Sequence, residues 1–331
     1  MILQQPFLLY LGDATSPLAV KTSRGIAQWR PDLCIGEYSN KNCTISLNVE
    51  QMTPEVAKKK GAKTFIVGLA NSGGKIAESW ISDIIIALEQ GMDVASGLHQ
   101  KLVDIEIIRN AAIEHGCQIH DVRHFTGAIP VGTGKKRSGK RLLTVGTDCS
   151  VGKMYTSLAI EREMKQQGFD VEFKATGQSG LLLGASGICV DAVVADFISG
   201  AIELISPDAA PEHWDIIEGQ GSLFNPSFAG VSTGLLHGAQ SDLIVMCHEA
   251  GRQFIKDLEG YKLPDLKQCI EHNLTVGRLT NPNIKLAGIS LNCRLVGKEK
   301  GLAMIKDLEK RFGVPCFDPI LTGVKNLVDT L

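Results

Sequence analysis

Short hydrophobic runs alternate with longer segments of helical periodicity along almost the whole chain. In the first half, the expected strands lie at residues 7–11, 32–36, 63–67, 92–95 and 117–122. Residues 75–90 carry hydrophobic side chains at helical spacing, namely Ile76, Trp80, Ile84 and Leu88. Because strands that alternate with helices form right-handed βαβ units, this pattern predicts a parallel sheet covered by helices.

A second series of the same kind begins at residue 142. Its expected strands lie at residues 142–145, 170–173, 215–217, 243–247 and 286–291, and its helices include residues 151–167 and 300–312. Between the two series, residues 131–141 are rich in glycine and basic side chains, and we interpret them as a solvated linker. The pattern therefore predicts an α/β protein with one domain in residues 1–130 and another in residues 142–331.

The composition agrees with two globular domains and narrows the partners. The chain has 331 residues, of which 44% are hydrophobic and 21% are charged, as in ordinary globular proteins. A net charge of −2 gives no overall basic field, so we expect a small-molecule substrate and no nucleic-acid or membrane partner. The nine cysteines form no C-x-x-C pair, which is typical of reduced thiols and indicates a cytoplasmic protein.

The sharpest motif is a glycine-rich loop between an apolar strand and an amphipathic helix. It reads Gly146-Thr147-Asp148-Cys149-Ser150-Val151-Gly152-Lys153-Met154. The backbone N–H groups of such a P-loop cradle phosphates, and its lysine neutralises the anion. Met154 stands where Ser or Thr would bind Mg²⁺, so the motif predicts phosphate binding without Mg²⁺-dependent hydrolysis. The alternative is a strand-to-helix turn that binds no ligand.

Cys149 lies inside this loop, near the start of the following helix. A thiol in that position often has a lowered pKa. Nucleophilic use would also require a paired base, and the sequence places none beside it.

Polar residues also follow two other strands of the second series. They are Lys174, Thr176 and Gln178 after one strand, and Glu218, Gln220 and Ser222 after another. Because ligands bind at the carboxyl ends of strands in open α/β sheets, we expect Glu218 to be a general base or cation ligand and the other five to bind substrate. His237 is a further acid–base candidate and His248 a weaker one. A surface lysine, an ordinary acid at a strand end and structural histidines are the alternatives.

Two resemblances rest on these motifs. The second half resembles the dethiobiotin synthetase-like P-loop proteins, through residues 146–153, Lys174 with Thr176-Gly177, Glu218-Gly219 and Gly288-Ile289-Ser290-Leu291-Asn292. Nearly the whole chain resembles the bacterial family called domain of unknown function 1611, through residues 146–153, 175–180, 218–222 and 235–240. The second resemblance implies a Rossmann-like N-terminal domain joined to a P-loop NTPase-like α/β domain. It also implies D-glutamate N-acetyltransferase activity with acetyl-CoA as the co-substrate.

Our first hypothesis is therefore an N-acyltransferase that moves acetyl from acetyl-CoA to the amino group of an amino acid. The P-loop would hold the phosphates of coenzyme A, while Glu218 and His237 would take a proton from the acceptor ammonium. Lys174 or the basic residues of the linker would bind an acceptor carboxylate.

Two other hypotheses remain open at this point. An ATP-dependent ligase or kinase of the dethiobiotin synthetase type would hold Mg²⁺ on Asp148 and Glu218, with Thr147, Ser150 and Thr156 compensating for Met154. A nucleotide-sensing regulatory protein would close its two domains on a ligand without turnover. Since doubly wound proteins often associate with themselves, we also expect a homo-oligomer.

Overall fold

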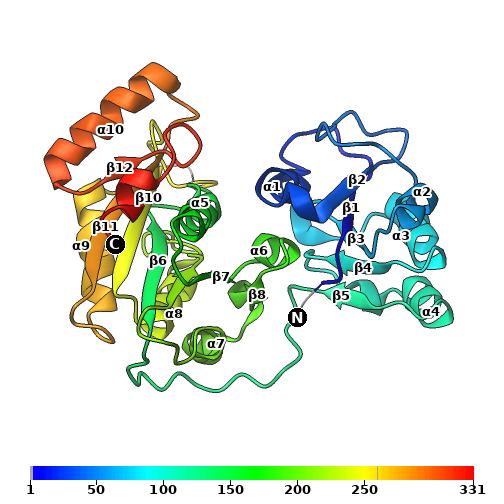
Figure 1. Ribbon diagram of the computed structural model, residues 1–331, viewed down its shortest axis with the longest axis horizontal. Helices are drawn as coiled ribbons and strands as arrows, with labels where there is room; N and C mark the ends of the chain where they lie inside the picture. The colour runs from blue at the N-terminus through cyan, green and yellow to red at the C-terminus, as the bar shows by residue number, and fades with distance from the viewer. Residues whose placement is uncertain (1–2, 259) are drawn as a thin grey trace. The chain divides into compact units, whose positions relative to one another are not determined.

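The computed structural model describes residues 3–258 and 260–331, and the chain forms two compact units (Figure 1). The first unit comprises the chain through Thr126 together with Gln178–Cys189, and the second comprises Gly127–Gly177 and Val190–Leu331. Each unit contains a parallel sheet with helices packed against it, so the predicted α/β class is confirmed.

The sheet of the first unit has the strand order β2-β1-β3-β4-β5. Its strands are β1 (Phe7–Tyr10), β2 (Cys34–Tyr38), β3 (Thr64–Val67), β4 (Asp93–Ser96) and β5 (Ile119–Asp121). Every residue of β1, β3 and β4 is buried, as expected for central parallel strands that are covered on both faces. All five strands overlap the positions predicted from the hydrophobic runs.

The helices of the first unit follow the same local rules. They are α1 (Lys21–Trp29), α2 (Pro54–Lys59), α3 (Glu78–Glu89), α4 (Glu106–Glu114) and α6 (Gln178–Leu182). Helix α2 begins where the side chain of Thr53 accepts a hydrogen bond from the backbone N–H of Val56, with Pro54 as the first helical residue. Both are favoured choices at a helix start. In α3, the predicted apolar face of Trp80, Ile84 and Leu88 is buried.

The second unit contains a larger sheet, in which six strands follow the order β12-β11-β10-β6-β9-β7. These strands are β6 (Lys140–Gly146), β7 (Val171–Ala175), β9 (Trp214–Ile217), β10 (Leu243–Glu249), β11 (Lys285–Asn292) and β12 (Cys316–Phe317). The short strand β8 (Ser186–Gly187) lies in the segment that belongs to the first unit. The helices of the second unit are α5 (Lys153–Gln166), α7 (Ile198–Ile205), α8 (Ala229–Ala239), α9 (Leu266–Gly277), α10 (Lys298–Phe312) and α11 (Lys325–Val328).

The connections of this sheet reverse direction around β6. From β6 the chain passes through α5 to β7 on one side, whereas β10 and β11 lie on the other side of β6. In open α/β sheets the ligand crevice lies at the carboxyl ends of the strands where such a reversal occurs. The topology therefore predicts a ligand site at the loop after Gly146.

The basic segment at residues 131–141 is not a uniformly solvated connector. Arg137 and Arg141 are 8% and 0% exposed. The Arg141 side chain donates to Ser206 Oγ at 2.8 Å and to the carbonyl of Pro207 at 2.8 Å, and the Arg137 side chain contacts the carbonyls of Ser206 and Gly238. These two guanidinium groups fix the start of β6 and are not available to bind an acceptor carboxylate.

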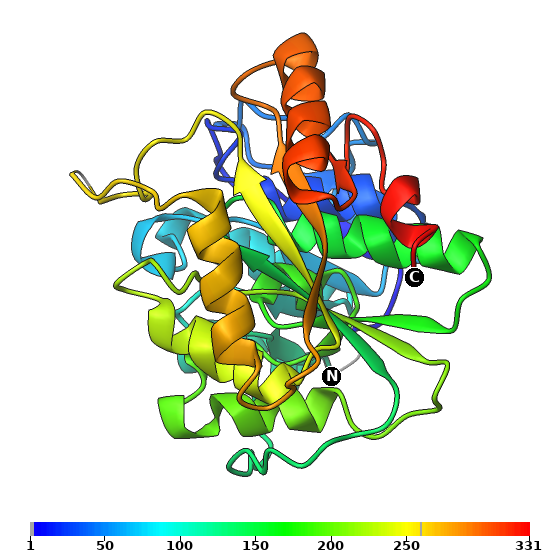
Figure 2. The same cartoon turned by 90° about the vertical axis from the view of Figure 1, so that its left-hand side faces the viewer.

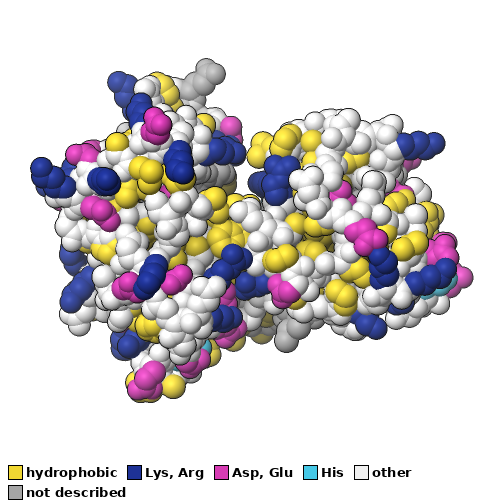
Figure 3. Space-filling view, turned by 45° about the horizontal axis from the view of Figure 1, so that its top comes forward, with side chains coloured by type: hydrophobic (Ala, Val, Ile, Leu, Met, Phe, Trp, Pro, Cys, Tyr) yellow, Lys and Arg dark blue, Asp and Glu magenta, His cyan; other side chains and the backbone are white. Residues whose placement is uncertain are grey.

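Charges of both signs are interspersed on the face shown in Figure 3, where lysine and arginine side chains alternate with acidic ones over each unit.

Among the described residues, no helix has both the length and the apolar character needed to cross a membrane.

Candidate active site

The P-loop joins the end of β6 to the start of α5. Ser150 has a φ of 57° and Gly152 a φ of 109°, so the chain turns through the left-handed region twice before the helix begins. In the part of the chain that the structure describes, the backbone N–H groups of Val151 and Gly152 have no hydrogen-bond acceptor. Free N–H groups at a helix N-terminus attract anions, so the loop fits a phosphate group.

Lys153, the first residue of α5, is buried beneath this loop. Its Nζ atom donates to the backbone carbonyl of Asp148 at 2.9 Å and to that of Gly221 at 2.8 Å. Burial lowers the pKa of this ammonium group, and the nearby acidic groups Asp148 and Glu218 only partly oppose that effect, because a charge removed from water is disfavoured. A phosphate bound at the loop would add a further negative charge close to this ammonium.

Glu218 follows β9 and is 4% exposed. Its Oε2 atom accepts hydrogen bonds from the backbone N–H groups of Thr176 at 3.1 Å and Gly177 at 3.2 Å. The Thr176 hydroxyl donates to the carbonyl of Glu218 at 2.6 Å. Burial raises the pKa of the carboxyl to about 7, although these N–H groups and the nearby Lys153 act in the opposite direction. Glu218 can therefore exchange a proton near neutral pH.

The turn after Glu218 holds this carboxyl against the P-loop. The Gly219 N–H donates to Thr144 Oγ1 at 3.0 Å, and the Ser222 hydroxyl donates to the carbonyl of Thr147 at 3.1 Å. A Cβ atom at Gly219 would lie 1.7 Å from the Thr144 carbonyl oxygen, so only glycine permits this approach. The Gln220 side chain hydrogen-bonds to Glu218. The structure thus brings Thr176, Glu218, Gln220 and Ser222 together beside the loop.

Asp148 has a different role from the one expected. Its side chain is fully buried and accepts hydrogen bonds from Arg252 at 2.9 Å, Asn225 at 3.1 Å and the backbone N–H of Lys256 at 2.7 Å. Burial alone would raise the pKa of this carboxyl, but the donors outweigh it and lower the pKa. Asp148 therefore anchors the P-loop to the segment after β10, and its carboxylate is not available to phosphate or Mg²⁺.

The hydroxyl groups considered as Mg²⁺ ligands are also engaged. Thr147 Oγ1 lies 3.0 Å from His248 Nδ1, and Thr156 Oγ1 lies 2.7 Å from Ser290 Oγ. Lys256 Nζ lies 3.4 Å from Ser150 Oγ. Met154 is half-buried and offers only a thioether, which is a poor ligand for a hard cation.

The thiol of Cys149 is not activated by its position in the loop. Burial raises the pKa of this thiol, and Lys153 only partly opposes that effect. The prediction of a lowered pKa at this helix start is wrong, because the loss of water outweighs the nearby positive charges.

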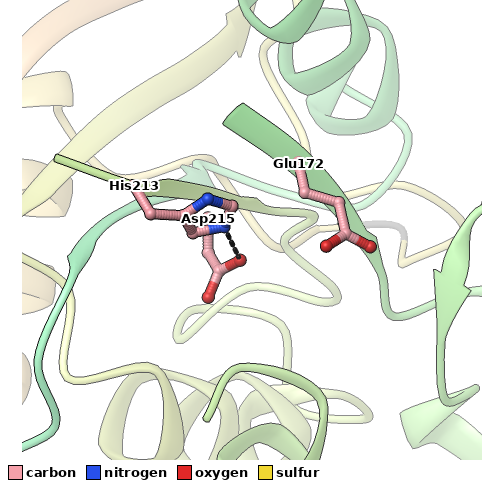
Figure 4. A group of neighbouring side chains, drawn as sticks. All are labelled: Glu172, His213 and Asp215. Carbon is pink, nitrogen blue, oxygen red and sulfur yellow. Dashed lines mark hydrogen bonds and ion pairs between the residues drawn. The ribbon is translucent and has the colours of Figure 1, made fainter. Parts of the chain in front are cut away.

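Lys174 turns away from the carboxyl end of the sheet. Its Nζ atom lies 2.6 Å from Glu172 Oε2 and 3.5 Å from Asp215 Oδ1, two carboxylates nearer the amino ends of their strands. Glu172, His213 and Asp215 form a group that could hold a metal ion (Figure 4). Because the Lys174 ammonium already contacts both carboxylates, we assign a structural role to Lys174 and propose no metal there.

Two other expected residues lie on helices. Gln178 is the first residue of α6, directly after Gly177, and α6 belongs to the first unit, so its role in substrate binding stays a prediction. His237 lies on the last turn of α8, while Ser232 of the same helix donates to the carbonyl of Gln220 at 2.8 Å. Five residues along a helix span about 7.5 Å, so His237 lies toward the amino ends of the strands. It is not placed to work with Glu218.

Sequence reasoning underrated His248 and missed Arg252. His248 on β10 contacts Thr147 as described, and burial lowers the pKa of its imidazole. Arg252 donates to the carbonyl of Cys149 at 2.8 Å and to Glu249 Oε2 at 2.8 Å. The signal available in the sequence was an acid and an arginine three residues apart, directly after a predicted strand.

Comparison with known proteins places the chain in a family. The P-loop domain model of the domain of unknown function DUF1611 matches residues 130–328, and the Rossmann-like domain model of the same name matches residues 34–125. The chain belongs to the DUF1611 family. The resemblance predicted from the motifs is therefore confirmed, as is the combination of a Rossmann-like and a P-loop domain.

Three relatives in this comparison cover essentially the whole chain. A protein of Pseudoalteromonas sp. named D-glutamate N-acetyltransferase is 49% identical over 331 residues, which are 100% of both chains. A protein of Tritonibacter scottomollicae with the same name is 45% identical over 330 residues, covering 100% of this chain and 99% of that one. The crystal structure of a DUF1611 family protein from Anabaena variabilis is 27% identical, with a TM-score of 0.87 over 98% of each chain.

Within this DUF1611 fold, the site combines two chemical capacities. The loop at residues 146–154 offers free N–H groups and a buried ammonium to an anion. Glu218 offers a carboxyl that changes protonation near pH 7. A phosphate-bearing substrate and a proton to be removed are the two requirements that this pair can meet.

Proposed function

We propose that this protein transfers an acetyl group from acetyl-CoA to the amino group of D-glutamate. The acceptor and the transferred group follow from two relatives of 49% and 45% identity that share the name D-glutamate N-acetyltransferase. Acetyl-CoA, the co-substrate that the family resemblance implies, is our proposed acetyl donor, since it is a phosphate-bearing acetyl carrier that suits the P-loop.

The choice of acetyl-CoA as the acetyl donor rests on the side chains around the P-loop. Asp148 is committed to Arg252, and Met154 replaces the hydroxyl that would bind Mg²⁺. Coenzyme A places phosphates on such a loop but requires no cleavage of a γ-phosphate. This chemistry favours acetyl transfer over the ATP-dependent ligase or kinase, in which Mg²⁺ is held by the protein.

In the proposed reaction, the acceptor ammonium first loses a proton to Glu218. The free amine then attacks the thioester carbonyl carbon and a C–N bond forms. As the C–S bond breaks, the attacking nitrogen loses its second proton to the leaving sulfur, so that the amide and the free thiol of coenzyme A result. Because amines attack only when unprotonated, a carboxyl with a pKa of about 7 is a suitable acceptor for this proton. The buried Lys153 beside it keeps part of the carboxyl population ionised.

The proposal is tested by titration calorimetry with acetyl-CoA and with ATP, each with and without Mg²⁺, followed by measurement of thiol release with D- and L-glutamate. We expect metal-independent binding of acetyl-CoA and thiol release that requires D-glutamate. Lys153→Ala is expected to weaken acetyl-CoA binding about 100-fold and to reduce thiol release, whereas Lys300→Ala, which removes an exposed lysine on α10, is expected to change neither.

Other outcomes would replace the proposal. Mg²⁺-dependent ATP binding with no binding of acetyl-CoA would favour the ligase or kinase. Nucleotide binding without turnover of any amino acid would favour a sensor.

A further inference from the structure

A cavity of about 470 Å³ lies in the second unit, between the segment after β10 and helices α9 and α10. That segment extends away from the sheet before it returns to α9 (Figure 2). The floor of the cavity is apolar and includes Leu266, Leu291, Met304 and Leu308. A volume of several hundred cubic ångströms with an apolar lining is typical of a small-molecule site.

Three cationic side chains line the rim of this cavity. Arg252, Lys262 and Arg311 line it, and Asp265 is the acidic residue among its lining. Arg252 is neutralised by Glu249 and Asp148, and Arg311 lies 3.4 Å from Asp265. Among the described residues, Lys262 has no carboxylate partner. Within that part of the chain, the Lys262 ammonium is thus the rim cation without an acidic contact.

Two residues of the cavity wall contact the P-loop. His248 lines the cavity and contacts Thr147 Oγ1 at 3.0 Å, and Arg252 lines it while donating to the carbonyl of Cys149. The wall of the cavity is therefore in direct contact with the loop. By contrast, the space beside the turn at residues 219–222 is only about 10 Å³.

We propose that this cavity binds the adenosine 3′-phosphate end of coenzyme A, with the nucleoside on the apolar floor and the 3′-phosphate at Lys262. The inference rests on the proposed function, because it assumes that coenzyme A is the donor. A flat base suits an apolar floor, and a phosphate suits a free ammonium at the rim. Glutamate carries two carboxylates and little apolar surface, so it fits this floor poorly.

The test compares coenzyme A with 3′-dephospho-coenzyme A, which lacks only the proposed ligand of Lys262. Dissociation constants of both are measured for the full-length wild type, for Lys262→Gln and for the control Lys300→Gln. Loss of one charge-assisted contact corresponds to about a tenfold change in affinity. We expect the wild type and the control to prefer coenzyme A about tenfold. Lys262→Gln should lose this preference and retain its affinity for the dephospho compound.

Equal affinity of the wild type for the two compounds would overturn the inference and leave the proposed function intact. The same holds if Lys262→Gln raises the KM for D-glutamate and leaves both dissociation constants unchanged, since the cavity would then hold the acceptor. Failure of the wild type to bind either compound would instead refute the proposed donor. A second variant, Leu263→Trp, narrows the cavity at its half-buried wall and is expected to weaken the binding of both compounds.

Discussion

The Nζ atom of Lys153 lies 2.8 Å from the carbonyl oxygen of Gly221. This hydrogen bond joins the P-loop to the turn that follows Glu218, so the two chemical parts of the site are physically connected. An anion that attracts the Lys153 ammonium toward the loop would also weaken the hydrogen bond between Lys153 and Gly221. Phosphate binding and the environment of Glu218 are therefore expected to depend on each other.

Replacement of Lys153 tests this connection. Lys153→Ala removes two hydrogen bonds and the only ammonium buried beneath the loop among the described residues. With about 3 kcal/mol lost, acetyl-CoA should bind about 100-fold more weakly. Titration calorimetry measures the affinity, and circular dichroism verifies that the variant is folded. Unchanged affinity in a folded variant would remove the P-loop from the site.

Glu218→Gln should separate chemistry from binding. The amide keeps the size of the side chain but cannot take a proton, so kcat should fall by about 10²–10⁴-fold. The dissociation constant of acetyl-CoA should change little. A wild-type kcat that rises with pH through about 7 would match the raised pKa of Glu218, since only the ionised carboxyl accepts a proton. A variant that retains full kcat would require another base, and His248→Ala would then be the next test.

The same carboxyl should also affect stability. Because the pKa of Glu218 is about 7 in the folded protein and 4.5 in the ordinary state, the folded chain binds more protons between these values. The free energy of unfolding should therefore decrease as pH rises from about 4.5 to 7, by an amount of the order of 3 kcal/mol. Urea denaturation across this range measures the slope, and Glu218→Gln should flatten it. Equal slopes for the two proteins would contradict the raised pKa.

Arg252 should be important for stability in a way that nearby Arg294 is not. Arg252→Ala leaves the buried carboxylates of Asp148 and Glu249 without their cation, which costs about 3–5 kcal/mol. Arg294 lies 3.8 Å from the same Glu249, but its side chain is 80% exposed, so Arg294→Ala should cost about 1 kcal/mol or less. Urea denaturation of both variants provides the comparison. Similar midpoints for the two would show that the Asp148 pair contributes little.

His237→Ala should leave kcat and KM within about twofold of the wild type, since substitutions at positions distant from an active site have small effects. The residue lies on the last turn of α8, away from Ser232 and the turn it contacts. Steady-state kinetics with D-glutamate measures both constants. A large loss of kcat in a folded variant would restore His237 as an acid–base residue.

The fold could be predicted from the sequence because most strands contain a short hydrophobic run. The clustering of the P-loop with Thr176, Glu218 and Ser222 also followed from a simple rule, since the carboxyl ends of neighbouring parallel strands meet at one edge. Such a rule places backbone positions but does not direct side chains. Lys174 is long enough to reach back to Glu172 and Asp215, and no spacing in the sequence reveals that choice.

Other errors have the same physical origin. His237 lies on α8, the helix that follows strand β9, and the length of α8 carries it toward the opposite edge of the sheet. Arg252 acts from a loop without regular periodicity. Its spacing from Glu249 is visible in the sequence, but its pairing with Asp148 could be found only from the folded chain. Ion pairs between residues that are distant in the sequence are the feature of the site that the residue pattern could not predict.

The segment Gln178–Cys189 belongs to the first unit although the chain on both sides of it belongs to the second. Within the first unit, Ser179 Oγ lies 3.1 Å from Thr22 Oγ1 on α1. A gene fragment that starts near residue 130 would therefore encode Gln178–Cys189, a segment of the first unit, without the rest of the unit against which this segment packs. A single cut in the chain therefore cannot divide the protein into two autonomous halves. For the same reason, evolution cannot exchange the P-loop half as an independent unit without also rebuilding the segment Gln178–Cys189.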